Sequence, residues 1–117
     1  MEELLSYLSN YALDHNIGVV LTRYLKPTTS SAASQKRRMI VINMRWKNQK
    51  EIPFIFGHEL GHVEGDAVYY YHDGECTSQS SEQAADCFSI CLLYQYALSH
   101  QQTFSSACQF MQCYGIP

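Results

Sequence analysis

The chain has 117 residues, of which 46% are hydrophobic and 16% are charged, so we expect one domain with a single core over residues 1–117. The net charge of -3 gives no general attraction to nucleic acid or anionic membranes, and the arginines are too few and scattered for a nucleic-acid site. No stretch approaches the roughly 20 apolar residues that span a bilayer, and the acidic start MEELLSYLSN does not resemble a secretory signal. We therefore expect a cytoplasmic protein, either a monomer or a small homo-oligomer.

The first half of the chain predicts one helix and two strands. Residues 3–14 carry an apolar stripe with helical period. Residues 17–25 and 37–44 are rich in β-branched and apolar side chains, which favours strands. The polar segment 26–35, KPTTSSAASQ, is expected to be a mobile loop that joins them. We expect the two strands to pair as an antiparallel ribbon.

The second half predicts three helices. Residues 48–65 form one, with Pro53 in its first turn and Gly65 as its stop. Residues 66–79 mix a short strand with turns. A long helix over 80–98 opens with a serine cap, and a last helix over 103–115 is expected to be capped by Thr103. The order of elements indicates an α+β fold with a small antiparallel sheet.

The five cysteines indicate reduced thiols in place of a disulfide framework. Their number is odd, and the sequence contains no C-x-x-C pair. Cys87 and Cys91 are four residues apart, so we expect both to face one side of the long helix as small buried hydrophobes.

The run FGHELGH, residues 56–62, has the spacing of a metal-binding helix. His58 and His62 lie one turn apart on one face, so both imidazoles can reach one ion. Glu59 lies about 100° further round the helix, where its carboxylate can take a proton from a metal-bound water without being a ligand. This H-E-x-x-H pattern predicts a zinc site with Glu59 as general base. The alternative is that both histidines are hydrogen-bonded residues of a core helix with no metal-binding role.

A catalytic zinc site needs a third protein ligand. The extended template H-E-x-x-H-x-x-G-x-x-H fails, because Gly65 fits it but position 68 is Val68. A rigid helix would carry Asp66 about 12 Å from His58, too far to share an ion. Three further residues remain candidates: His72, Asp73 and Glu75.

Glu82 is the best candidate for the third ligand. It begins a run, Glu82 to Asp86, in which both carboxylates share one face of the long helix. Glu82 is then expected to complete the metal shell, and Asp86 to accept the second ring N–H of a histidine ligand, for which we choose His58. Ala84 and Ala85 allow close approach of the two helices. An acidic first turn that merely suits the helix dipole is the alternative.

These motifs together resemble the ImmA/IrrE-type metallopeptidases, small zinc proteins of phages, mobile elements and bacterial chromosomes. The resemblance covers roughly residues 38–98 and is carried by RMIVIN, IPFIFGHELGH and SSEQAADCFSICLL. In the second helical motif Ser89 replaces the usual alanine, and a glutamate often present before the motif's other alanine is Ala84 here. The resemblance implies a small zincin-like, gluzincin-like domain that cuts a regulator, commonly a helix-turn-helix repressor.

We therefore expect a zinc-dependent metallo-endopeptidase that uses Zn²⁺, although manganese, iron or nickel would also fit the ligands. Tyr71 and His72 are candidate donors to the transition state. Segment 26–35 or the first strand could hold an extended substrate by strand addition. The alternative is a catalytically weak zinc protein that binds a partner, as in repressor or toxin–antitoxin regulation.

Overall fold

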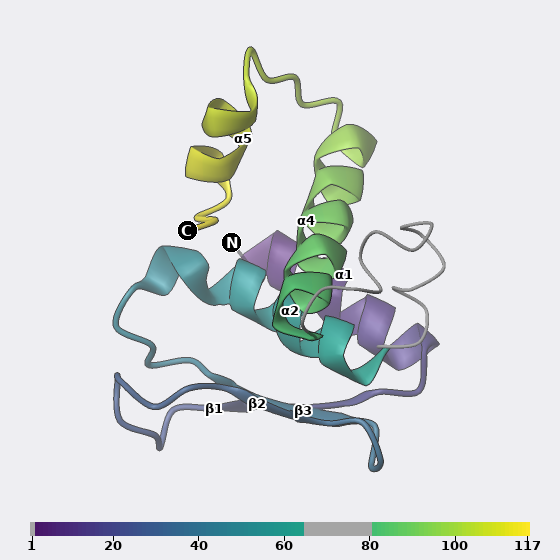
Figure 1. Ribbon diagram of the computed structural model, residues 1–117, viewed down its shortest axis with the longest axis vertical. Coiled ribbons are helices and arrows are strands. Elements are labelled where there is room, and N and C mark those ends of the chain that lie inside the picture. Colours follow the sequence, from purple (N-terminus) through teal and green to yellow (C-terminus); the bar gives the residue numbers. More distant parts are fainter. Residues whose placement is uncertain (1, 65–80) are drawn as a thin grey trace.

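Three short strands form a sheet that is covered on one face by helices (Figure 1). The computed structural model describes residues 2–64 and 81–117. Over these residues the fold is α+β, as predicted, and no helix in these ranges is long and apolar enough to cross a membrane. The elements in order are α1 (Glu2–Asp14), β1 (Gly18–Thr22), β2 (Ala32–Ser34), β3 (Met39–Asn43), the 3-10 helix η1 (Gln49–Glu51), α2 (Ile52–Val63), α4 (Ser81–Ser99) and α5 (Ala107–Cys113).

The sheet is mixed, so the predicted antiparallel ribbon is wrong. The order is β1-β3-β2, and β1 pairs with β3 in parallel, with Gly18 opposite Met39 and Thr22 opposite Asn43. The segment expected to be a loop contains β2, which forms an antiparallel hairpin with β3. In this hairpin β2 pairs along one edge of β3. Strand β1 pairs along the other edge of β3, so the chain between β1 and β2 crosses from one side of β3 to the other.

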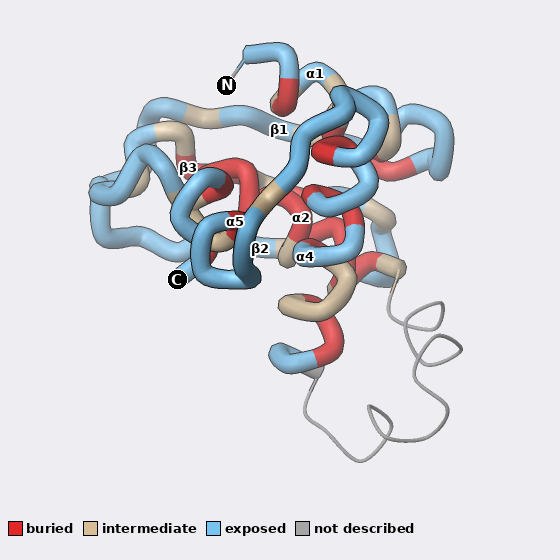
Figure 2. The backbone as a smooth tube through the Cα atoms, turned by 90° about the horizontal axis from the view of Figure 1, so that it is seen from above, coloured by how far each residue is buried: buried red, intermediate tan, exposed pale blue. Residues whose placement is uncertain are grey.

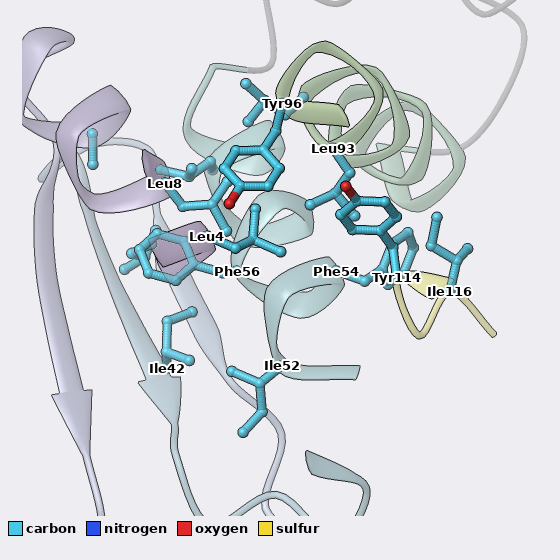
Figure 3. Close-up of a cluster of buried hydrophobic side chains, with 14 of the residues drawn as sticks. Leu4, Leu8, Ile42, Ile52, Phe54, Phe56, Leu93, Tyr96, Tyr114 and Ile116 are labelled. Atoms are coloured by element: carbon cyan, nitrogen blue, oxygen red, sulfur yellow. The ribbon is translucent and has the colours of Figure 1, made fainter. Parts of the chain in front are cut away.

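A single hydrophobic core lies between the sheet and the helices. Leu4, Leu8 and Ala12, from the predicted stripe of α1, are buried. They meet Ile40 and Ile42, which alternate along β3 and so face the same side of the sheet. Buried residues concentrate along β3, α2 and the facing side of α4 (Figure 2). Figure 3 shows how α1, α2, α4 and the chain end after α5 all contribute side chains to this cluster.

Helices α2 and α4 pack backbone against backbone. A Cβ atom added to Gly61 would lie 3.0 Å from the Cα atom of Ala85 and 3.1 Å from its carbonyl oxygen. A Cβ atom added to Gly57 would collide with the hydroxyl of Ser89, which donates a 2.7 Å hydrogen bond to the carbonyl of Phe54. The expectation that Ala85 permits close helix approach is confirmed. Ser89, the departure from the family pattern, therefore links the two helices.

The ends of two helices differ from the prediction. Helix α5 begins later than expected, and its N-cap is Ser106, whose hydroxyl accepts from the Gln109 N–H, instead of Thr103. Phe110 of this helix is buried in the core. Helix α2 ends at Val63 with Glu64 as C-cap, and the expected stop at Gly65 lies outside the described residues, as does the predicted short strand in 66–79.

Two further residues take roles that the sequence did not indicate. Cys91 was expected to be buried but is exposed on α4, because the face of α4 that meets α2 passes through Ala85, Ser89 and Leu92. Arg38 donates to the carbonyl of His15 at 2.7 Å and to the Glu64 carboxylate at 2.5 Å. It thereby ties the end of α1 to the end of α2.

The contact at Gly61 predicts a stability change. Gly61→Ala gains about 1 kcal/mol of helix propensity but forces the backbones of α2 and α4 apart, which costs about 1–3 kcal/mol. We expect a net loss in the free energy of unfolding, measured by urea denaturation. Ser6→Ala, on the exposed face of α1, is the control and should change stability by no more than about 0.5 kcal/mol. A Gly61→Ala protein more stable than the wild type would contradict the proposed close packing.

Candidate metal centre

The histidines of FGHELGH lie on the side of α2 that faces the start of α4. The apolar residues Phe56, Leu60 and Val63 anchor α2 in the core. Pro53 lies in the first turn of α2, as predicted, where its missing N–H removes no hydrogen bond. His58 and His62 are partly buried, with 15% and 23% of their side chains exposed. The core thus fixes the helix, and the helix fixes the direction of both rings.

Three residues of ligand type converge between α2 and α4. The Nε2 atoms of His58 and His62 are 3.1 Å apart. The Glu82 carboxylate approaches both rings, with Oε2 at 2.9 Å from the His58 Nε2 and Oε1 at 3.0 Å from the His62 Nε2. Among the described residues, His58, His62 and Glu82 are the group of side chains that lie close enough together to hold one metal ion. The structure brings together the three residues predicted as ligands.

Asp86 lies where the sequence placed it, behind His58. Its Oδ1 atom is 2.7 Å from the His58 Nδ1. A carboxylate only accepts, so the proton of a neutral His58 sits on Nδ1 and leaves a lone pair on Nε2. Asp86 and Glu82 are one turn apart on α4, and this spacing lets one face hold both nitrogens of a single ring.

The His58 Nε2 lies close to two atoms at once. It is 2.9 Å from the Glu82 Oε2 and 3.1 Å from the His62 Nε2. Protons on the two Nε2 atoms can satisfy the carboxylate, but the pair of imidazole nitrogens can share only one hydrogen bond. With neutral rings, a cation placed among these atoms would be attracted by both imidazole lone pairs and by the carboxylate.

Glu59 differs from Glu82 in its surroundings. Only 8% of Glu59 is exposed, whereas 69% of the Glu82 side chain is exposed. Burial raises the pKa of the Glu59 carboxyl above its ordinary value, the nearby His58 and His62 lower it, and Glu82 raises it again. Glu59 also lines the cleft that contains His58 and His62.

The site opens into a cleft of about 800 Å³ between α2, the start of α4 and the β2 strand. Its wall on the sheet side consists of Ser31, Ala33 and Gln35, whose alternation places them on one face of the strand. Trp46 closes one end, and its ring N–H donates to the Glu51 carboxylate at 3.0 Å.

The sequence pointed to the 26–35 segment as a possible substrate holder, but as a loop and without naming these residues. Ser31, Ala33 and Gln35 carry no chemical signature of their own. Trp46 could have been noticed in the sequence. It is the single tryptophan of the chain and follows the strand that precedes the H-E-x-x-H helix.

Four of the predicted site residues lie outside the described ranges. Tyr71 and His72 are the candidate donors to the transition state. His72, Asp73 and Glu75 are the further candidates for the third ligand. The family pattern often has a second glutamate at the position of Ala84. This chain has a buried alanine there, so that position offers no metal ligand.

No protein-family model, no curated protein and no solved structure matches this chain. The resemblance to the ImmA/IrrE-type metallopeptidases therefore rests on the motifs alone, and the functional argument rests on the geometry of the site.

Proposed function

We propose that this protein is a zinc-dependent metallo-endopeptidase with His58, His62 and Glu82 as metal ligands and Glu59 as general base. The observation that carries the proposal is the convergence of three ligand residues from two helices: the two imidazole Nε2 atoms are 3.1 Å apart, and the two oxygens of the Glu82 carboxylate lie 2.9 and 3.0 Å from them. Tetrahedral zinc with bonds of about 2.0–2.1 Å requires ligand atoms about 3.4 Å apart, a few tenths of an ångström wider. The residues therefore fit a zinc ion after a small outward movement.

The donor set supports zinc without excluding other metals. Two imidazole nitrogens and one carboxylate oxygen are the three protein ligands of a common class of catalytic zinc site, which keeps its fourth position open. Manganese, iron and nickel accept the same ligands. The exposed side of Glu82 faces the cleft, so a water molecule can reach the site from solvent.

Each residue of the chain has a distinct task in the proposed hydrolysis. A bound zinc ion would lower the pKa of a coordinated water and polarise a substrate carbonyl. Asp86 accepts the Nδ1 proton of His58 and so holds the tautomer that presents Nε2 to the metal. Glu59 takes the proton from the attacking water, and the raised pKa that burial gives its carboxyl suits it to pass that proton to the leaving amine.

The cleft supports a peptide as the substrate. Among the described residues the outer edge of β2 carries no strand partner, so its N–H and C=O groups are available to an extended chain. The sequence offered two candidates to hold the substrate, the first strand and the 26–35 segment. Strand β1 contributes no residue to the cleft, whereas the 26–35 segment contributes Ser30, Ser31, Ala33 and Gln35. By the family resemblance, the substrate is a regulatory protein such as a helix-turn-helix repressor of a phage or mobile element, cut at few sites.

The metal site predicts zinc content. We expect about one zinc per wild-type chain, measured by inductively coupled plasma mass spectrometry after purification without chelators. His62→Ala and Glu82→Ala each remove a ligand and should leave less than about a tenth of that zinc. His100→Ala, at the exposed end of α4, is the matched control and should keep it. Equal zinc in the His62→Ala and wild-type proteins would contradict the ligand assignment.

The contact between Asp86 and His58 predicts a graded loss of affinity. Asp86→Ala removes the acceptor and should weaken zinc binding roughly 10- to 100-fold in a competition titration with a chromophoric chelator. Asp86→Asn retains an acceptor oxygen without the charge and should recover part of the loss. Asp14→Asn, an exposed carboxylate on α1, should have no effect. An unchanged affinity in Asp86→Ala would show that Asp86 does not position His58.

The general base predicts a separation of binding from catalysis. Glu59→Gln should retain zinc but lose hydrolysis by about 100-fold or more, because general-base catalysis contributes at least that much. The probes are fluorescein-labelled casein and, if a neighbouring gene encodes one, a helix-turn-helix repressor, with cleavage followed by fluorescence and by gel. Glu64→Gln is the matched control, since Glu64 pairs with Arg38 and lies outside the cleft lining.

Two outcomes would overturn parts of this assignment. Undiminished cleavage by Glu59→Gln would remove Glu59 from the mechanism. A wild-type protein that holds zinc and captures the repressor, but leaves it intact for hours, would favour the partner-binding module over the peptidase.

A further inference from the structure

Positive and negative side chains are segregated along this chain. All 8 Lys and Arg residues lie between His15 and Lys50, a stretch that contains no Asp or Glu, and all 11 acidic residues lie outside it. In the fold this stretch comprises the sheet, its connecting loops and the start of η1, whereas the described acidic residues lie in or beside the helices. The modest net charge therefore conceals a strongly basic sheet layer.

Four of these cations gather at one end of the sheet. Arg23 and Lys26 follow β1, while Arg45 and Lys47 follow β3, and all four are exposed. Because β1 and β3 are parallel, their carboxyl ends lie at the same end of the sheet, and so do the segments that follow them. We call Arg23, Lys26, Arg45 and Lys47 the basic loop cluster.

Hydrogen bonds hold the two segments of the basic loop cluster side by side. The Lys47 N–H donates to the carbonyl of Pro27 at 2.9 Å. The buried Asn43 amide donates to the carbonyls of Lys26 at 2.8 Å and Thr29 at 2.7 Å. A side chain that is 1% exposed thus ties the end of β3 to the loop after β1. The cations are presented from a fixed backbone.

The charges of the cluster are not neutralised within the described part of the chain. There, Arg38 is the one Lys or Arg within 4 Å of a carboxylate, that of Glu64, and it does not belong to the cluster. Four uncompensated exposed cations create a positive potential that attracts acidic ligands and that salt weakens.

The cluster continues the candidate catalytic cleft. Trp46 lies between Arg45 and Lys47 in the chain and lines the cleft together with His58 and Glu59. The Lys47 Nζ atom lies 5.4 Å from the centre of the Trp46 ring. Strand β2 begins after the 23–31 segment and runs along the cleft to the turn at 35–38. An extended chain on the open edge of β2 would therefore lead from the metal ligands to these cations.

We propose that the basic loop cluster and Trp46 form a recognition site for acidic residues on one side of the scissile bond of the protein substrate. This inference rests on the proposed peptidase function and adds the substrate class. A peptide accounts for two features together, because its main chain can pair with β2 while its carboxylates meet the cations. A nucleic acid would use the cations but leave the strand edge without a partner.

Binding of defined peptides to the Glu59→Gln protein tests this site without requiring cleavage. The probes are fluorescein-labelled (Glu-Ala)5 and (Gln-Ala)5, with fluorescence anisotropy and the emission of Trp46, the single tryptophan, as readouts. At roughly 0.05 M salt we expect the Glu peptide to bind about tenfold more tightly than the Gln peptide, and at roughly 0.5 M salt the preference should largely vanish.

Charge-reversed variants locate the preference. Arg45→Glu with Lys47→Glu should abolish it, because both cations border Trp46. Lys36→Glu with Arg37→Glu is the matched control: it changes the net charge equally but acts at the turn on the opposite end of the sheet, and should retain most of the preference.

Three results would overturn the proposal. The first is equal binding of the Glu and Gln peptides, and the second is an equal loss of preference in both double variants. The third is single-stranded oligothymidylate of matched charge binding more tightly than the Glu peptide and losing that binding in Arg45→Glu with Lys47→Glu, which would identify the ligand as nucleic acid. None of these readouts depends on hydrolysis, so failure of the peptidase assignment would be distinguishable.

Discussion

The close contact of α2 with α4 is the constraint on which the rest of the structure depends. Gly57 and Gly61 remove two side chains from the line of contact, so that Ser89 and Ala85 meet the α2 backbone directly. The Ser89 hydroxyl bonds across this line to a carbonyl of α2 with a fully buried hydrogen bond. Such backbone packing leaves little freedom to slide, because any shift brings main-chain atoms into collision. The relative position of the two helices is thereby constrained.

This contact has a chemical consequence. His58 and His62 lie between and beside the two glycines on α2, while Glu82 and Asp86 lie one turn apart at the start of α4. Holding the helices together therefore brings two imidazoles and two carboxylates within hydrogen-bond distance. A metal ion placed among them would be held by imidazole lone pairs and a carboxylate oxygen. The sheet completes the arrangement by supplying the cleft wall and, at its end, the basic residues.

Local patterns predicted the helical part well. The stripe of α1, the early proline of α2 and the pairing of His58 with His62 and of Glu82 with Asp86 each follow from spacing within one helix, which is a short-range property. The errors lie where distant segments choose one another. The 26–35 segment is polar, yet β2 forms there because β3 offers it an edge. Cys91 faces solvent because packing on α2 fixes the rotation of α4.

The spacing of residues along the chain specifies which side chains can act and on which faces of their helices they lie: His58 with His62, and Glu82 with Asp86. Helical periodicity is sufficient for that, because it depends only on residues three or four apart. The sequence also led us to expect that the second pair meets the first, with Asp86 at the His58 ring, but the contact itself exists only in the folded chain. The gathering of cations after two different strands has no counterpart in the sequence pattern. Those relations depend on helix packing and on a parallel strand pair, and neither leaves a periodic mark in the sequence.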